Sequence, residues 1–175
     1  GAKATHLAAL SHNRADIVCI EPRPARASTL RGLAARMGAH LTVIEGDGRT
    51  VSLPGTFDAA LVDPPCTGLG VLSARPDARW RRREEDIAEL VALQSALLRR
   101  AIDVVRPGGR IIYSTCTLLP DENEQIVLAA GLEVLDLSAH FAQFAHPRLP
   151  GALLTLPSRD QTDGFFVAGL RVPNG

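Results

Sequence analysis

The chain has 175 residues, of which 46% are hydrophobic and 22% are charged, and this composition excludes wholesale disorder, collagen and a coiled coil. Its length favours one domain that buries roughly 70% of the unfolded surface, so it needs no disulfide or metal for stability. Nineteen basic residues balance nineteen acidic ones, which excludes a uniformly basic nucleic-acid binder but leaves room for a local basic patch.

Short apolar runs alternate with helical patterns along the chain. We expect strands at residues 15–21, 40–45, 57–62, 110–114, 132–137 and 164–172, and helices at 24–37, 84–105 and 120–130. Gly38 ends the first helix, Pro107-Gly108-Gly109 ends the second, and acidic residues begin the second and third. Because the strands are apolar throughout and alternate with helices, the sequence predicts an α/β fold with a mostly parallel sheet.

Ligands of an open parallel sheet bind beyond the carboxyl ends of its strands. The residues expected at that edge are Glu21, Asp47, 63–66 and 114–117. The loop-rich segment 138–163 is expected to cross the same edge, because long irregular segments are often functional.

Two carboxylates at this edge suit a nucleotide-like cofactor. Glu21 ends the first predicted strand, and an acid at that position commonly holds ribose hydroxyls. The alternative is an acid that stabilises the start of the next helix. Asp47 lies in a Gly-Asp-Gly turn, for which an ordinary turn residue is the favoured interpretation.

Two of the three cysteines also fall at this edge. Asp63-Pro64-Pro65-Cys66 forms a rigid rim that suits a flat aromatic substrate, and Cys116 follows the next strand. If those strands are neighbours, their tips lie about 5 Å apart, so one thiol can act as a nucleophile and the other can handle a proton. The residues alone do not choose between the thiols, and two unrelated core thiols remain the alternative. Cys19 lies inside a strand and is interpreted as structural.

An arginine-rich segment follows the Cys66 rim in a predicted loop. Its members are Arg75, Arg79, Trp80, Arg81, Arg82 and Arg83. Arginines around an aromatic ring suit phosphate contact and base stacking. The alternative is a solvated loop paired with the acidic residues 84–86.

Five motifs, taken in order, resemble the Nop2/Sun group of RNA cytosine-carbon-5 methyltransferases, and within it the bacterial Sun/Fmu type. The motifs are GDGR at 46–49, DPPCTGLGVL at 63–72, RPDARW at 75–80, STCT with LLPDENE at 114–124, and DGFF at 163–166. The resemblance covers nearly the whole chain, and the two-cysteine pattern is specific to that group. It implies S-adenosylmethionine as cofactor, a Rossmann-like class I methyltransferase sheet, and a cytosine of small-subunit (16S) ribosomal RNA as substrate.

The resemblance also implies roles for individual residues. Glu21 would hold the ribose, Asp47 would lie by the adenine, and Asp63 would lie near the methionine end and the cytosine, whose edge it could hydrogen-bond. Cys116 would be the nucleophile that adds to carbon 6 of the cytosine. Cys66 would assist loss of the carbon 5 proton and release of the adduct. Independently of the resemblance, mild oxidation is expected to link Cys66 and Cys116 if the two thiols share one pocket.

The start of the chain departs from the family pattern, which has a strand and a loop ending Pro-Gly-Gly-Lys-Thr. Here Gly1-Ala2-Lys3-Ala4-Thr5-His6-Leu7 is similar to the end of that motif. We therefore expect residues 1–175 to form a single S-adenosylmethionine-dependent methyltransferase domain, incomplete at the N-terminus and lacking the first strand. Gly1, Ala2 and Lys3 are expected at a helix start that faces the methionine carboxylate.

Two other functions stay open: a fragment that only binds RNA, and an amino-group methyltransferase with an Asp-Pro-Pro rim. Cys66 argues against the second, because such enzymes usually carry an aromatic residue there. We expect a monomer that acts on ribosomal RNA without a membrane or a metal. Free thiols and the lack of a signal peptide predict a cytoplasmic location.

Overall fold

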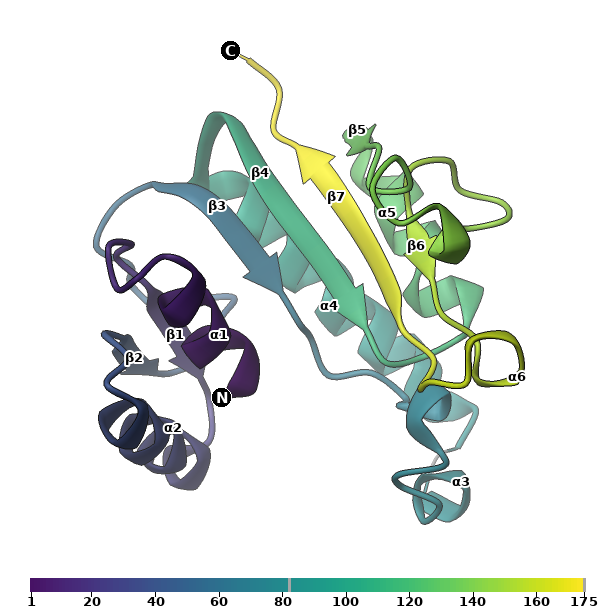
Figure 1. Ribbon diagram of the computed structural model, residues 1–175, viewed down its shortest axis with the longest axis horizontal. Helices are drawn as coiled ribbons and strands as arrows, with labels where there is room; N and C mark the ends of the chain where they lie inside the picture. The colour runs from purple at the N-terminus through teal and green to yellow at the C-terminus, as the bar shows by residue number, and fades with distance from the viewer. Residues whose placement is uncertain (82, 175) are drawn as a thin grey trace. The chain divides into compact units, whose positions relative to one another are not determined.

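The computed structural model describes residues 1–81 and 83–174, and the chain forms two compact units, Gly1–Leu53 and Pro54–Gly175. The order of the elements can be followed by colour in Figure 1. Among the described residues, no helix is both long and apolar enough to cross a membrane. That the two units act as one methyltransferase domain stays a prediction.

The first unit contains two helices and a pair of parallel strands. Its elements are α1 (Ala2–Leu10), β1 (Val18–Glu21), α2 (Pro24–Met37) and β2 (Thr42–Glu45). Val18 lies opposite Thr42 and Glu21 opposite Glu45, so β1 and β2 end at the same edge. The predicted bounds of α2 are confirmed: Pro24 stands in its first turn, and Gly38 follows it with a φ of 63°, a left-handed conformation that glycine adopts readily.

The second unit contains a five-stranded sheet in the order β3–β4–β7–β5, with β6 paired to β7. These strands are β3 (Phe57–Val62), β4 (Val105–Thr115), β5 (Glu133–Leu135), β6 (Leu153–Leu154) and β7 (Phe166–Arg171). β3 and β4 are parallel, whereas β7 is antiparallel to β4, β5 and β6. Four strands therefore run in one direction and β7 alone runs in the other, which confirms the predicted α/β fold with a mostly parallel sheet.

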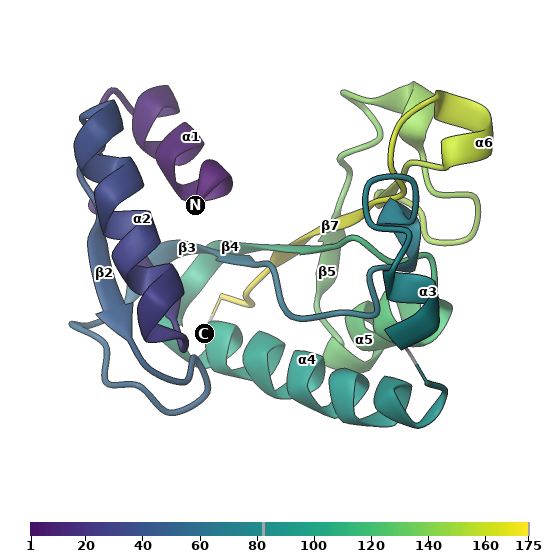
Figure 2. The same ribbon diagram turned by 90° about the horizontal axis from the view of Figure 1, so that it is seen from below.

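One face of this sheet is covered by α4 (Glu85–Val104) and α5 (Glu124–Ala130), as Figure 2 shows. The core between them is apolar. Its most buried members include Leu98, Ile111, Tyr113, Val127, Phe166, Ala168 and Leu170. The remaining elements are short and lie in the connections: η1 (Leu69–Val71), α3 (Ala78–Arg81), η2 (Pro120–Glu122), η3 (Ala142–Phe144) and α6 (Pro157–Asp160).

Two predicted boundaries are wrong. β4 begins at Val105, so the Pro-Gly-Gly sequence lies within the strand rather than in a turn before it. Gly108 adopts a φ of 72°, and the pairing of β3 with β4 shifts register between Phe57 and Ala59, which gives the strand an irregularity that glycine permits. The helix predicted at 120–130 is interrupted at Asn123, whose backbone leaves helical geometry (φ −118°, ψ −96°).

Two further predictions need correction. β3 is the outer strand of the described order, and Asp58, Ala59 and Leu61 are exposed, so it is not the fully buried strand that its apolar sequence predicts. The arginine-rich segment is not wholly a loop, because residues 78–81 form the short helix α3. Backbone bonds from Ala78 to Arg75 and from Trp80 to Asp77 close its turns.

Candidate active site

The two cysteine loops leave neighbouring parallel strands. Val62, the last residue of β3, lies opposite Tyr113 in β4. Cys66 lies four residues beyond Val62, and Cys116 follows the last residue of β4. The Sγ atoms of Cys66 and Cys116 are 3.3 Å apart. The structure thus brings the two thiols together, as the neighbouring strand ends predict.

The two thiols differ in accessibility. Cys66 is buried, with 8% of its surface exposed, whereas Cys116 is partly exposed. The hydrogen bond with the Cys116 sulfur, together with burial, raises the pKa of Cys66 well above its ordinary value. A raised pKa favours the neutral thiol form of Cys66. Cys19 lies within β1, where burial raises the pKa of its thiol, consistent with a structural role.

A fully buried carboxylate, Glu122, holds the Cys66 loop. Its Oε1 accepts a hydrogen bond from the backbone N–H of Thr67 at 2.9 Å, and its Oε2 accepts one from the Thr67 hydroxyl at 2.5 Å. Gln94 of α4 donates through Nε2 to Glu122 Oε1 at 2.8 Å and to the carbonyl of Pro65 at 2.9 Å. The residues on both sides of Cys66 are therefore tied to α4 and η2.

The adjacent residue, Asn123, holds the Cys116 loop. The hydroxyl of Thr115 donates to Asn123 Oδ1 at 2.5 Å, and Asn123 Nδ2 donates to the carbonyl of Thr117 at 2.9 Å. The hydroxyls of Thr67 and Thr117 lie 2.7 Å apart and join the two loops. Sequence reasoning placed Thr115 and Thr117 at this edge without a role, and it did not single out Glu122, Asn123 or Thr67. The signal was the polar run in LLPDENE, between an apolar strand and an apolar helix.

A third loop completes this framework. The backbone N–H of Gly70 donates to the carbonyl of Cys116 at 2.9 Å, and the N–H of Gly164 donates to the carbonyl of Gly70 at 2.7 Å. The Ser73 hydroxyl donates to Asp163 at 2.7 Å. The TGLG and DGFF motifs therefore have a structural reason to occur together, because they pack beside Cys116.

The predicted ribose and adenine residues lie at one edge of the first unit. Glu21 ends β1, and its Oε1 accepts the backbone N–H of Arg23 at 3.0 Å. The N–H of Gly46 donates to the carbonyl of Glu21 at 3.3 Å, which joins that strand end to the turn holding Asp47. A carboxylate has about four acceptor positions, so Glu21 retains capacity for ribose hydroxyls. These residues fit a nucleoside.

Asp47 is paired within its own turn. Both of its carboxylate oxygens accept hydrogen bonds from the Arg49 guanidinium, and the backbone N–H of Arg49 donates to Oδ1 at 2.9 Å. These contacts lower the pKa of Asp47 to about 2. The carboxylate is therefore ionised at neutral pH, the form that accepts a hydrogen bond from an amino group.

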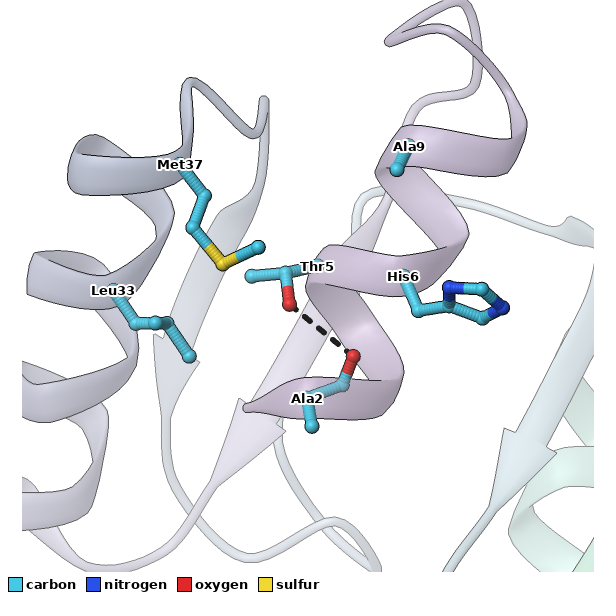
Figure 3. A pocket seen from close by; sticks show the side chains of 6 residues that line it. All are labelled: Ala2, Thr5, His6, Ala9, Leu33 and Met37. Carbon is cyan, nitrogen blue, oxygen red and sulfur yellow. Dashed lines mark hydrogen bonds between the residues drawn. The ribbon is translucent and has the colours of Figure 1, made fainter.

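Gly1, Ala2 and Lys3 stand at the start of α1, as predicted. Gly1 packs against α2, since a Cβ on it would lie 2.8 Å from a methyl of Leu33. Ala2 also lines a groove of about 460 Å³ between the two helices. Its other lining residues are Thr5, His6, Ala9, Leu33 and Met37. In Figure 3 Leu33 and Met37 point toward α1, the imidazole of His6 points away from α2, and the Thr5 hydroxyl donates to the Ala2 carbonyl at 3.2 Å.

Asp63 belongs to the second unit and is exposed just beyond β3.

The arginine-rich segment is exposed. Trp80 exposes 84% of its surface, and Arg75, Arg79, Arg81 and Arg83 are exposed as well. Arg81 forms an ion pair with Asp77 at 3.2 Å. Arg82 lies outside the described residues. An exposed indole beside guanidinium groups is typical of a surface that stacks on bases and contacts phosphates.

The sheet, with β7 alone reversed, defines the class: a Rossmann-like α/β methyltransferase fold. The chain belongs to the 16S rRNA methyltransferase RsmB/F family, which matches residues 1–171. That family consists of S-adenosylmethionine-dependent methyltransferases. Among the described residues, no group of three or more His, Cys, Asp and Glu side chains could hold a metal ion.

Similar proteins agree with this assignment. The chain is 36% identical over 173 residues to ribosomal RNA small subunit methyltransferase B of Salmonella newport (strain SL254), covering 97% of this chain and 39% of that protein. The corresponding protein of Enterobacter sp. (strain 638) is 37% identical, with 97% and 40% covered. The crystal structure of NSun6 from Pyrococcus horikoshii with SFG, an analogue of S-adenosylmethionine, has a TM-score of 0.88 and 30% identity, covering all of this chain and 46% of that one. The chain thus spans about two fifths of the length of the curated relatives it matches.

Proposed function

We propose that the chain carries the catalytic residues of an enzyme that transfers a methyl group to carbon 5 of a cytosine in 16S ribosomal RNA. The observation that carries this proposal is the 3.3 Å contact between Cys66 and Cys116 at the carboxyl ends of β3 and β4. Two thiols of different accessibility suit a reaction in which one sulfur attacks a ring carbon and the other handles a proton. The names of the relatives support ribosomal RNA as the substrate.

Cys116 is the proposed nucleophile, because it is the more exposed thiol. Its thiolate adds to carbon 6 of the cytosine, a C–S bond forms, and the ring electron pair moves to carbon 5. S-adenosylmethionine supplies the electrophilic methyl group that carbon 5 takes. Cys66 passes its own proton to the departing Cys116 sulfur and takes the carbon 5 proton. The C–H electron pair returns to the ring, the C–S bond breaks, and Cys116 leaves as a thiol whose proton is released to solvent.

Cys66 is the proposed proton carrier. Its raised pKa keeps it a neutral thiol, which can donate a hydrogen bond to the departing Cys116 sulfur and so assist its release. Asp63, exposed beside this loop, is proposed to hydrogen-bond the cytosine edge. The proposed roles of Cys66 and Asp63 use only residues of the Cys66 loop and the end of β4.

The cofactor is proposed to bind through residues of the first unit. Glu21 would accept hydrogen bonds from the ribose hydroxyls, and Asp47 would accept one from the adenine. The backbone N–H groups of Gly1, Ala2 and Lys3 at the start of α1 would face the methionine carboxylate, which a helix N-terminus favours. RNA would contact the guanidinium groups of Arg75, Arg79, Arg81, Arg82 and Arg83 and stack on Trp80.

The test compares three cysteine variants with 16S ribosomal RNA and labelled S-adenosylmethionine. Cys116→Ala is expected to abolish methyl transfer and adduct formation. Cys66→Ala is expected to accumulate a protein–RNA adduct that survives a denaturing gel, because the C–S bond forms but is not released. Cys19→Ala is the control and is expected to behave as wild type. Normal turnover by Cys66→Ala would contradict the proposed role of Cys66.

The exposure of Trp80 beside four exposed arginines favours one second candidate, a part that binds RNA without methylating it. Its signature is RNA affinity that falls steeply with salt, with no calorimetric binding of S-adenosylmethionine. Methyl label on an exocyclic amino group of the RNA would instead support an amino-group methyltransferase.

A further inference from the structure

Two consecutive residues, Glu122 and Asn123, are both fully buried and polar. We infer that they are positioning residues that set the separation of the Cys66 and Cys116 sulfurs. The catalytic consequence of this inference rests on the proposed function. The separation itself can be measured without any substrate.

Each of the two residues holds one loop. Glu122 contacts the residue after Cys66 through both carboxylate oxygens, at 2.9 Å to the Thr67 backbone and 2.5 Å to its hydroxyl. Asn123 contacts the residues on both sides of Cys116, at 2.5 Å to Thr115 and 2.9 Å to Thr117. Glu122 and Asn123 are consecutive residues, so the distance between the two cysteine loops depends on the backbone of one short turn.

The groups at the two ends of this hydrogen-bond network determine which hydroxyl donates and which accepts. The backbone N–H of Leu119 donates to the Thr117 hydroxyl at 3.3 Å, and the Thr67 hydroxyl donates to Glu122. Of the two hydroxyls that lie 2.7 Å apart, Thr117 must therefore donate and Thr67 accept. The chain of bonds runs from Leu119 through both threonines to the carboxylate, and it crosses from the Cys116 loop to the Cys66 loop.

Gln94 adds a second connection to the Cys66 side. Both hydrogens of its amide are used, one on Glu122 and one on the carbonyl of Pro65. Its Oε1 is buried without a hydrogen-bond partner among the described residues. Turning the amide over would set that oxygen against two acceptors, so the observed orientation is retained despite the unpaired atom. An unpaired buried oxygen lowers stability. Such a cost is expected where a side chain is retained because it fixes the position of a functional loop.

A carboxylate at this position is also costly in itself, since burial of a charge is unfavourable and Thr67 and Gln94, from which Glu122 accepts, are neutral donors. Hydrogen bonds to an ionised acceptor are about twice as strong as neutral ones. The carboxylate therefore holds Thr67, and with it Cys66, more firmly than a neutral side chain would.

The experiment uses the rate of disulfide formation between Cys66 and Cys116 as a measure of their separation. Oxidised glutathione takes two electrons from the two thiols, an S–S bond forms, the two thiol protons are released to the glutathione sulfurs, and two reduced glutathione molecules result. The rate is measured by peptide mapping of the whole chain, in the absence of RNA and S-adenosylmethionine. Methyl transfer by each variant is measured in parallel.

The variants are Glu122→Ala, Glu122→Gln and Asn123→Ala, with Glu124→Gln as the matched control. Glu124 belongs to the same motif and is buried, but its carboxylate contacts His146 and Arg148. Glu122→Ala and Asn123→Ala are expected to slow disulfide formation about tenfold and to lower kcat about 100-fold, the scale of a 1 Å misplacement, with KM for RNA unchanged. Glu122→Gln keeps one acceptor oxygen, so its disulfide rate and its kcat are expected to lie between those of Glu122→Ala and wild type. Glu124→Gln is expected to have the wild-type disulfide rate and kcat.

Wild-type disulfide rates in Glu122→Gln and Asn123→Ala would overturn the inference, whatever the effect on kcat. A slowed disulfide rate in a chain whose wild type transfers no methyl group would support positioning and contradict the proposed function. If Glu122→Ala does not fold, Thr67→Val replaces it. That change removes the same hydroxyl link with little change of volume, and it is expected to slow disulfide formation too.

Discussion

Gly70 and Gly164 pack backbone against backbone beside Cys116. The N–H of Gly164 donates to the carbonyl of Gly70 at 2.7 Å, and a Cβ on Gly70 would lie 2.1 Å from the Gly164 carbonyl oxygen. Gly70 in turn donates to the carbonyl of Cys116 at 2.9 Å. The contact between two glycines 94 positions apart therefore supports the loop that carries the proposed nucleophile.

Gly70→Ala is expected to destabilise the chain by about 1–3 kcal/mol, the usual cost of overpacking, because neither backbone can give way to the methyl group. Urea denaturation measures the change. Gly32→Ala is the control: Gly32 lies in α2 with open space around its Cα, and alanine there is expected to raise stability by about 0.5–1 kcal/mol. Equal midpoints for Gly70→Ala and wild type would contradict the close packing.

Mild oxidation is expected to link Cys66 and Cys116 and to block methyl transfer reversibly. The sulfurs need to approach by only about 1.3 Å to reach the 2.05 Å of a disulfide. Peptide mapping after treatment with hydrogen peroxide should recover the linked pair, with Cys19 still alkylatable, and dithiothreitol should restore activity. Two free thiols at positions 66 and 116 after oxidation would count against this prediction.

Stability is expected to fall below about pH 6.5 because of His146. Its Nδ1 accepts the backbone N–H groups of Arg148 and Leu149 at 3.1 and 2.9 Å, so the ring proton is on Nε2, 3.2 Å from Glu124. Burial lowers the pKa of His146 despite the attraction of Glu124, and Arg148 lowers it further. The unfolded chain then takes up a proton that the folded chain does not, so the free energy of unfolding decreases as pH falls from about 6.5 toward the folded pKa, by at most about 1.4 kcal/mol per unit.

His146→Asn provides the comparison, because the amide oxygen of asparagine can accept from the same backbone N–H groups but does not titrate. Thermal unfolding between pH 5 and 7 should show a smaller decrease in stability for this variant than for wild type. If stability decreases with falling pH equally in wild type and His146→Asn, His146 does not contribute to the pH dependence of stability.

Trp80→Ala is expected to weaken RNA binding by about 1–3 kcal/mol, the value of one stacked base, and to leave stability unchanged because the side chain is 84% exposed. Arg79→Ala should weaken binding and reduce the salt dependence by about one phosphate contact. Fluorescence anisotropy with a 16S ribosomal RNA fragment measures both. Arg106→Ala serves as control, since Arg106 pairs with Asp58 at 2.6 Å, and it is expected to bind RNA as wild type does.

Glu21→Ala is expected to weaken S-adenosylmethionine binding at least tenfold, about 1.4 kcal/mol, because the ribose hydroxyls lose their acceptor. Glu45→Ala is the matched control: Glu45 lies opposite Glu21 at the end of the neighbouring strand but pairs with Arg31 at 2.6 Å. Isothermal titration calorimetry of the chain compares them. Equal affinities for Glu21→Ala and Glu45→Ala would remove Glu21 from the proposed cofactor site.

The fold class could be predicted from local patterns. The bounds of β3 and α2 agree with the apolar run and the Pro-to-Gly helix pattern, since both signals depend on neighbouring residues. The start of β4 could not be predicted, because a Pro-Gly-Gly sequence is typical of a turn and its inclusion in the strand depends on pairing with β3 and with residue Val172. The exposed face of β3 likewise depends on which strands flank it.

The sequence by itself determined the alternation of strands and helices, the five motifs and the presence of two cysteines at strand ends. Each of these depends only on residues that are close together in the sequence. Only the tertiary structure decided which thiol is the more exposed and what holds the pair together. Glu122 meets Gln94 and Thr67 across 28 and 55 residues of chain. Such hydrogen bonds form only when the strands and α4 have packed, since no local propensity encodes partners at that distance.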